Sequence, residues 1–411
     1  MTRQVNQNMK SEEDNSLIAN LTNTLRTDCL SVLKNQIIPF WLSMRDNLYG
    51  GFYGLLDFDL NLNKQADKGV IQGSRILYFF SDASLSLKSV PLAEAAEHAY
   101  KFMTKYCFDE TFGGVYWSVT FDGKPSDTVK HTYNQAFAIY ALSSYYALSK
   151  NPLAIDKALQ LFYLIESKCK DSYGYLESFN RDFTPSQNDK LSENNVIASR
   201  TMNTLLHVFE GYSALYRQTK NSDVKNALLG ILDIYRKHVF NNTLNRQEVF
   251  FDSDYNSLID LHSYGHDIES SWLIEQGCQL LDDNSLISDI SSICDKLAKN
   301  IFDTAYINSS VCNEMEKGKL DSTRVWWVQS EAVVGFFNMW QKYPEQTQYL
   351  YASIRIFRYI QNFLVDKRPN SEWFWAVDKD GLPLNRFNIA DQWKCPYHNG
   401  RMCLEILRRT K

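Results

Sequence analysis

FGGVYW at Phe112–Trp117 and the helical pattern KHTYNQAFAIYALSSYYALS at residues 130–149 together form the unit from which the fold is predicted. Valine and aromatic residues beside glycines are typical of a short hairpin, and apolar residues three and four positions apart predict a helix. Similar aromatic segments return along the chain at residues 50–54, 173–176, 249–252 and 373–376. Most of them lie about 60–75 residues apart, which indicates an internal repeat.

Helical patterns fill the chain between these segments. Clear examples lie at residues 92–107, 130–149, 152–168, 200–218, 222–237, 263–281, 323–342 and 345–364. We count about twelve such patterns, two for each of six repeats, with no Pro/Gly/Ser-rich linker between them. Because closing the array into a ring buries both of its ends, we expect an all-α (α/α)6 barrel with short β-hairpins in the connecting loops. Residues 16–411 are predicted to form this single catalytic domain, after a disordered polar tail over residues 1–15.

The composition excludes several classes of function. The net charge is −5 and no Lys/Arg cluster is suited to a phosphate backbone, so no nucleic-acid partner is expected. No apolar run is long enough to span a bilayer, so no membrane partner is expected either. The N-terminus lacks the apolar core of a signal peptide, and the eight cysteines form no C-x-x-C pair, which indicates a cytoplasmic protein. No exposed heptad pattern is present, and we expect a monomer.

Polar and aromatic residues collect in the first turns of every second helix, where a core helix is normally apolar. The residues concerned are Arg75, Tyr133, Gln135, Asn203, His207, His266, Glu269, Trp272, Trp326, Trp327, Glu331, Trp393 and His398. In a barrel, these six helix starts all face the same end. The pattern therefore predicts one cavity with aromatic walls and a few convergent polar groups, as ligand sites have.

Other interpretations of the same residues remain open. Each histidine could be a hydrogen-bonded core residue, and Arg75 could pair with a carboxylate. His262 and His266 have a spacing that can ligate zinc, but there is no H-E-x-x-H motif, and His262 precedes Ser263, which has the composition of a helix cap. We therefore expect no metal. A P-loop and a dinucleotide fingerprint are both absent, which favours chemistry without a cofactor.

Two histidines without a cofactor suit the inversion of a carbon next to a carbonyl. The proton leaves one face of the carbon and returns on the other, and imidazoles titrate close enough to neutrality to do both. The enediolate intermediate needs a nearby cation such as Arg75. Glu269, one turn from His266, is expected to orient that imidazole.

The sequence resembles the N-acylglucosamine 2-epimerase superfamily, and within it the cellobiose 2-epimerases. The resemblance extends over nearly the whole chain after the N-terminal tail. Its best-matching segments are GGFYGLLDFD (50–59), MNTLLHVFE (202–210), SYGHDIESSW (263–272), VWWVQSE (325–331) and WKCPYHNGRMCLE (393–405).

This resemblance implies an (α/α)6 barrel and a reversible C2 epimerisation of the reducing-end glucose of β-1,4-linked disaccharides or oligosaccharides. Cellobiose would yield glucosyl-mannose, and lactose would yield epilactose. It also implies roles for individual residues. His266 and His398 would be the acid/base pair, with Arg75, His207 and Glu269 as further catalytic groups. Tyr133, Asn203, Trp272, Trp327, Glu331 and Trp393 would bind the sugar.

Three alternatives remain. Mannobiose could be the substrate, or the chain could be a mannose isomerase on the same scaffold, since both reactions share the enediolate. More distantly, the fold also supports glycoside hydrolases, in which Glu269 and Glu331 would be the acid and the base.

Overall fold

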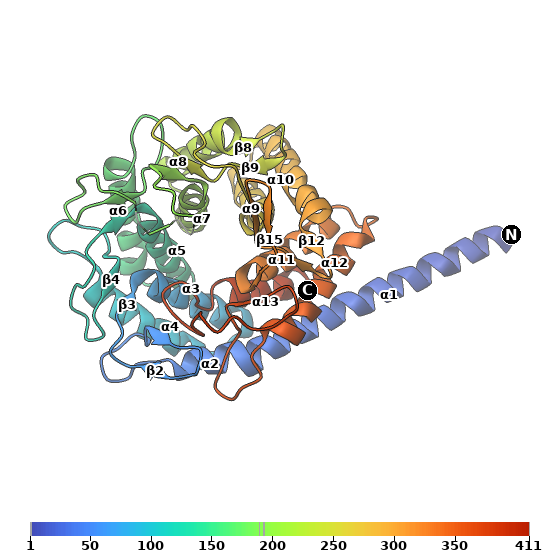
Figure 1. The fold of residues 1–411 in the computed structure, drawn as a ribbon, viewed down its shortest axis with the longest axis horizontal. Coiled ribbons are helices and arrows are strands. Elements are labelled where there is room, and N and C mark those ends of the chain that lie inside the picture. The colour runs from blue at the N-terminus through green and yellow to red at the C-terminus, as the bar shows by residue number, and fades with distance from the viewer. Residues whose placement is uncertain (1, 189, 192–193, 411) are drawn as a thin grey trace.

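The computed structural model describes residues 2–188, 190–191 and 194–410, with only the helical backbone for residues 2–15. Its helices form two concentric layers around a central axis (Figure 1). Among the described residues, six helices make up the inner layer. They are α3 (Val70–Leu87), α5 (Thr132–Ser149), α7 (Met202–Thr219), α9 (Tyr264–Cys278), α11 (Trp326–Lys342) and α13 (His398–Arg409). Each packs against the next, and α13 closes the ring against α3 and α11.

The outer layer alternates with the inner layer along the chain. Its members are α1 (Thr2–Val32) with its continuation α2 (Ile38–Ser43), α4 (Val90–Phe102), α6 (Pro152–Lys168), α8 (Ser222–Ile234), α10 (Asn284–Thr304) and α12 (Thr347–Tyr359). Several of them include or end in a π-helical turn, at η1 (Leu33–Ile37), η2 (Met103–Cys107), η3 (Tyr235–Val239) and η5 (Ile360–Leu364). A 3-10 turn, η4 (Gln279–Leu281), follows α9. The arrangement is the predicted (α/α)6 barrel.

The N-terminal part of α1 projects away from the ring (Figure 1). The described backbone is helical from Thr2 onward, and the disordered tail expected over residues 1–15 stays a prediction. The side chains of residues 2–15 lie outside the described part of the chain. From Leu25 onward α1 packs into the core, and Arg26 donates to the carbonyl of Leu407 in α13 at 2.6 Å.

Short antiparallel strands tie the repeats together at one end of the barrel. Among the described residues, five pairs join the strand before an inner helix to a strand of the following repeat. They are β3 (Lys68–Gly69) with β4 (Ser118–Val119), β5 (Lys130–His131) with β6 (Ser178–Phe179), β7 (Arg200–Thr201) with β10 (Phe250–Phe251), β11 (Leu261–Ser263) with β14 (Glu314–Glu316), and β16 (Arg324–Val325) with β17 (Ala376–Val377). These strands are therefore links between repeats, in addition to the local hairpins that the sequence predicts.

The other strands are more local. They are β1 (Leu55–Leu56) with β2 (Leu62–Asn63), β8 (Phe240–Asn241) with β9 (Arg246–Gln247), β12 (Tyr306–Ile307) with β13 (Ser310–Val311), and β14 with β15 (Lys319–Asp321), which extends the β11–β14 pair to three strands. Because a strand immediately precedes α5, α7 and α11, these helices begin two or three residues later than their sequence patterns indicate.

Buried ion pairs anchor the starts of the inner helices. Lys68 pairs with Asp46 at 2.7 Å, and Lys130 pairs with Asp109 at 3.1 Å, with both members of each pair shielded from solvent. In each pair the lysine precedes an inner helix and the acid follows the neighbouring outer helix. Removing an acid would leave its lysine buried without that counter-charge, so these pairs help to hold the helix starts in place.

Candidate active site

A cavity of about 330 Å³ lies at the N-terminal ends of the inner helices. Every inner helix contributes at least one polar or aromatic side chain to its wall. From α3 to α13 these are Arg75, Tyr133, Asn203, His207, His266, Glu269, Trp326, Trp327 and His398. Trp393, just before α13, lines the cavity as well. The structure thus brings together most of the residues that the sequence singles out.

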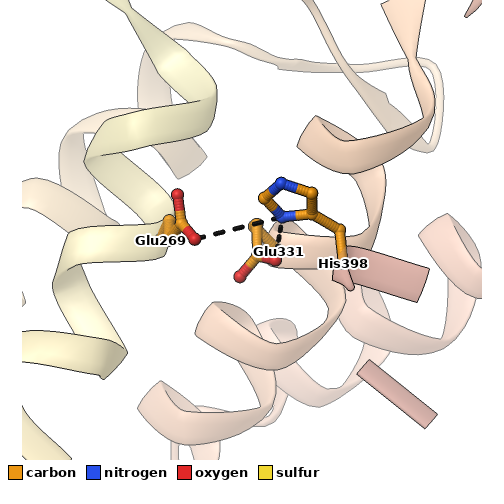
Figure 2. A group of neighbouring side chains, drawn as sticks. All are labelled: Glu269, Glu331 and His398. Atoms are coloured by element: carbon orange, nitrogen blue, oxygen red, sulfur yellow. Dashed lines mark hydrogen bonds and ion pairs between the residues drawn. The ribbon is translucent and has the colours of Figure 1, made fainter. Parts of the chain in front are cut away.

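The His398 imidazole is held in orientation by the carboxylate of Glu331. Its Nδ1 lies 2.8 Å from Oε1 of Glu331 and 3.9 Å from Oε1 of Glu269. Figure 2 shows that the other ring nitrogen points away from both carboxylates. Because an ionised carboxylate only accepts hydrogen bonds, Nδ1 carries the proton and the Nε2 lone pair is left for a substrate.

His266 has a different partner. Its Nδ1 lies 2.7 Å from Oγ of Ser263, so Nε2 is again the nitrogen left for the cavity. Glu269 was expected to orient this imidazole, but its Oε1 accepts a hydrogen bond from Arg401 instead. One turn of helix places Glu269 below His266, where it faces α13.

Trp327 packs against both imidazoles. Its ring centroid is 4.8 Å from that of His266 and 5.4 Å from that of His398. Gly265 makes this position possible, because a Cβ there would lie 2.3 Å from Cη2 of Trp327. His266 and His398 are therefore both in contact with one aromatic ring.

Arg75 is a buried cation without a carboxylate partner. Only 3% of its surface is exposed, and its guanidinium donates to the Tyr133 hydroxyl at 2.7 Å and to the Trp393 carbonyl at 3.2 Å. The guanidinium also lies over the rings of Phe137 and Tyr397, at 4.3 and 4.7 Å from their centroids. Among the described residues it makes no ion pair, so its charge is available to an anion that forms in the cavity.

His207 completes the polar wall. Its Nδ1 lies 2.9 Å from Oε2 of Glu210, and its ring packs against Tyr133 with centroids 5.1 Å apart. Glu210 also accepts a hydrogen bond from the Tyr397 hydroxyl. The His207 imidazole is therefore fixed in orientation in the same way as that of His398.

Arg401 connects these groups and is the main residue that the sequence reasoning missed. Its guanidinium donates to Glu210 at 2.6 Å, to Glu331 at 2.8 Å and to Glu269. A signal for it exists in the sequence, because a charged residue follows each cavity histidine by three positions. Residues three apart share a helix face. Arg401 follows His398 in this way, as Glu210 follows His207 and Glu269 follows His266.

Two residues expected to bind sugar do not line this cavity. Trp272 donates through its indole N–H to Oε2 of Glu331 at 3.1 Å, and it lines a separate cavity of about 400 Å³ together with Arg401 and Glu405. Trp272 is six residues beyond His266, which places it about 9 Å deeper along α9. Glu331 lies behind His398 and is 1% exposed, so its contact is with the imidazole. Trp272 and Glu331 thus form a chain of hydrogen bonds to His398, and their expected sugar-binding roles stay predictions.

The aromatic wall lies toward the mouth of the cavity. Trp393 packs against Trp117 and Tyr133, with ring centroids 5.7 and 6.2 Å apart. Trp375 and Phe387 stack with an interplanar angle of 12° and centroids 5.3 Å apart. Sequence reasoning missed the latter pair, because both residues lie in the irregular segment before α13. Flat rings of this kind present the apolar surfaces on which sugars stack.

Burial and charge set the protonation of the site. Burial, together with the charge of His207, lowers the pKa of His266 to about 3. Burial and the charges of Arg75 and Arg401 lower the pKa of His398 well below its usual range. Both imidazoles are therefore neutral at pH 7 and able to accept a proton.

The pKa values of Glu269 and Glu210 are shifted in opposite directions. Burial and the neighbouring Glu331 raise the pKa of Glu269 to about 7. Burial acts on Glu210 in the same direction, but the charge of Arg401 and the hydrogen bond from His207 outweigh it and lower its pKa to about 2. Glu210 is thus a fixed negative charge, whereas Glu269 titrates near neutrality.

A metal ion is the other species that these side chains could hold. One oxygen each of Glu269 and Glu331 and a nitrogen of His398 lie within 4.8 Å of one another (Figure 2). Arg401 already donates to Oε1 of both carboxylates, so a cation is present between them. His262, whose spacing from His266 could ligate zinc, is engaged elsewhere, because its Nε2 lies 2.8 Å from Oδ2 of Asp267. The donor set does not fit a resident metal.

Fold and cavity together define an (α/α)6-barrel protein with a candidate acid/base site built from imidazoles. A model of the family described as N-acylglucosamine 2-epimerase (GlcNAc 2-epimerase) matches residues 50–398. The chain belongs to this family, as its sequence motifs predict.

Relatives with longer coverage support this membership. A cellobiose 2-epimerase from Eubacterium cellulosolvens is 46% identical over 392 residues, which cover 92% of this chain and 96% of the relative. A cellobiose 2-epimerase from Ruminococcus albus is 45% identical, covering 92% of this chain and 97% of its own. The structure of a cellobiose 2-epimerase from Bacillus thermoamylovorans superposes with a TM-score of 0.91 at 42% identity, covering 94% of this chain and 100% of that one.

Proposed function

We propose that this chain reversibly inverts C2 of the reducing-end glucose of β-1,4-linked disaccharides, without a cofactor. Cellobiose would give glucosyl-mannose, and lactose would give epilactose. The observation that carries the proposal is the pair of imidazoles that both pack against Trp327, each held through Nδ1 and each with Nε2 left for the substrate. The names of the similar proteins support cellobiose as the substrate.

The reaction follows from these groups. After the sugar ring opens, Nε2 of one imidazole takes the C2 proton. The electrons of the C2–H bond form the C1=C2 double bond, and the carbonyl electrons move onto O1 to give an enediolate. Arg75, with no carboxylate partner, stabilises that negative charge. Rotation about C2–C3 presents the other face. There the second imidazole, which has first taken up a proton on Nε2 from solvent, transfers that proton to C2 as the carbonyl forms again, and the first imidazole releases the proton it removed to solvent.

The aromatic residues of the cavity wall provide a binding surface for the second sugar unit of a disaccharide. Trp393 lies next to Arg75, whose guanidinium contacts its carbonyl, and is proposed to stack on the non-reducing unit. Tyr133 and Asn203 line the wall near Arg75 and His207 and are proposed to bind the hydroxyls of the open chain. The two units of a β-1,4-linked disaccharide would thus lie along the cavity from the imidazoles to its mouth.

A glycoside hydrolase is disfavoured by the carboxylates. The acid and base of such enzymes stand on opposite sides of the scissile bond, about 5–9.5 Å apart. One oxygen of Glu269 and one of Glu331 lie within 4.8 Å of each other, and both carboxylates accept hydrogen bonds from Arg401. They therefore do not stand on opposite sides of a substrate.

The chain contains no helix, among its described residues, of the length and apolarity that a bilayer crossing requires.

We also propose that the protein acts as a monomer in the cytoplasm. All eight cysteines lie within the described residues, are buried, and form no disulfide, as a reducing compartment favours.

The test is product identification by NMR after incubation with cellobiose. Glucosyl-mannose supports the proposal, a ketose would mean isomerisation, and free glucose would mean hydrolysis. His266→Ala and His398→Ala should each lower kcat by about 10²–10⁴-fold, as expected for loss of a general acid or base. His238→Ala, on the outer layer beside Tyr255, is the matched control and should stay within about twofold. Near-normal turnover in either cavity variant would contradict the two-imidazole site.

A further inference from the structure

Ser263 stands at the N-cap position of α9, where a serine hydroxyl normally accepts a hydrogen bond from a backbone N–H of the first turn. Its side chain makes no such bond. The hydroxyl is instead engaged with Nδ1 of His266 at 2.7 Å. A helix cap is usually worth about 1 kcal/mol, so this serine gives up a stabilising contact in order to contact an imidazole.

The backbone that carries Ser263 is fixed on both sides. Ser263 belongs to β11 and pairs with Glu314 of β14. The preceding His262 contacts Asp267 at 2.8 Å, and Asp267 accepts a second hydrogen bond from Gln247 at 2.8 Å. The first turn of α9 is therefore clamped, and the Ser263 hydroxyl is presented to His266 from a rigid element.

The other side of the imidazole is also defined. Trp327 packs on it at 4.8 Å between centroids, in the space that Gly265 leaves free. His266 is thus held between an indole and a single hydrogen-bonding partner. Among the described residues, Ser263 is the hydrogen-bonding partner of the His266 ring.

The proposed reaction places a demand on this partner. His266 alternates between a neutral ring with a lone pair on Nε2 and a cation with a proton there. Nδ1 must keep its proton in both forms, so its neighbour must accept a hydrogen bond throughout. A hydroxyl has the acceptor lone pairs for this and is not itself ionised.

We infer that Ser263 is a positioning residue for catalysis. It accepts from Nδ1–H of His266 and so directs the Nε2 lone pair to C2 of the sugar. Ser263 does not touch the reacting atoms, and the inference rests on the proposed epimerisation. The C2 proton goes to Nε2 of His266, or comes from it in the reverse direction, and no proton leaves Ser263.

The two imidazoles are then supported unequally. His398 is backed by the carboxylate of Glu331, whereas His266 is backed by a neutral hydroxyl. An ionic partner stabilises an imidazolium more than a neutral one does. Ser263 therefore fixes the His266 ring without placing a negative charge beside it.

The experiment compares three serine variants. Ser263→Ala removes the acceptor and should lower kcat about tenfold, with KM within about twofold, since one hydrogen bond made to a reacting group is lost. Ser263→Thr keeps the hydroxyl and should restore kcat to within about threefold of the unsubstituted protein. Ser271→Ala is the matched control, because Ser271 is a buried serine of the same helix that donates to the Ile268 carbonyl and stays clear of the imidazoles.

A spectroscopic readout separates positioning from loss of structure. ¹⁵N NMR of histidine-labelled protein reports which ring nitrogen of His266 carries the proton, with the His266→Ala spectrum giving the assignment. We expect the Nδ1–H tautomer in the unsubstituted protein and a shift toward Nε2–H in Ser263→Ala. An Nε2–H tautomer in the unsubstituted protein would overturn the inference, as would a kcat for Ser263→Ala within twofold of normal.

Failure of the proposed function looks different. If the unsubstituted protein does not convert cellobiose to glucosyl-mannose, the epimerisation itself is wrong, whatever the tautomer of His266. If it does and Ser263→Ala is unchanged, only the role of Ser263 is wrong.

Discussion

Replacing Glu331 by glutamine tests the support of His398 while keeping its shape. The amide oxygen can still accept from Nδ1, so the ring stays oriented, but the negative charge 2.8 Å away is lost. At that distance, and with an effective dielectric constant of about 20, the carboxylate stabilises a full imidazolium by about 6 kcal/mol. If about half of that charge has developed at the transition state, the loss is about 3 kcal/mol. We therefore expect kcat to fall about a hundredfold.

The assay is the initial rate of glucosyl-mannose formation at saturating cellobiose. KM should change by less than about threefold, because Glu331 does not line the cavity. Glu275→Gln is the control: Glu275 is a buried glutamate that accepts from Lys342 at 2.7 Å and contacts no imidazole. It should lose stability but keep kcat within about twofold. A Glu331→Gln variant with kcat within threefold of normal would refute the electrostatic role of this carboxylate.

Three further predictions follow from the site and its surroundings. The folded chain raises the pKa of Glu269 from 4.5 to about 7, so this carboxyl holds its proton more tightly in the folded state and the fold loses stability as pH rises across that range. The stability of Glu269→Gln relative to the unsubstituted protein should therefore increase from pH 5 to pH 8, by up to about 3 kcal/mol in the free energy of urea unfolding. The same difference in unfolding free energy at pH 5 and at pH 8 would be evidence against the raised pKa of Glu269. Trp272→Phe removes the indole N–H that donates to Glu331 and should lower kcat about tenfold without raising KM. Trp393→Ala, at the cavity wall, should raise the KM for cellobiose. Steady-state kinetics in which Trp272→Phe raises KM and Trp393→Ala lowers only kcat would count against the placement of both residues. Gly265→Ala should displace the indole that packs against both imidazoles and lower kcat at least tenfold. Gly230→Ala, whose added Cβ meets nothing within 4 Å in α8, should raise stability by about 0.5–1 kcal/mol. Activity retained in Gly265→Ala would show that the indole can move freely.

The barrel was predictable because its repeats are visible in the sequence. Helical periodicity reports burial directly, so α6, for example, occupies the predicted residues 152–168. The pairing of strands between repeats was not predictable, because strands of two residues carry too little pattern to specify a partner. Lys68 and Asp46 show the difficulty: both are charged residues in loops, and only the closed ring reveals them as a buried pair.

The cavity was predictable to the depth of the first helical turn. Arg75, His207, His266 and His398 meet as expected, because helix starts in a closed ring point to one end. Deeper residues were misplaced, since a helix rises 1.5 Å per residue and Trp272 lies beyond the floor of the cavity. The network around Arg401 involves residues from four inner helices, and contacts of that kind depend on tertiary packing that one sequence does not display.

Solvent labelling tests the two-imidazole account most directly. The protein is incubated with cellobiose in D₂O, and the glucosyl-mannose formed at early conversion is examined by NMR. Because a second imidazole, equilibrated with solvent, returns the proton, we predict one deuterium at C2 of the reducing-end mannose in each product molecule and none at C1. Product that keeps the substrate's own C2 hydrogen at early conversion would contradict it, since one group would then have removed and returned the same proton.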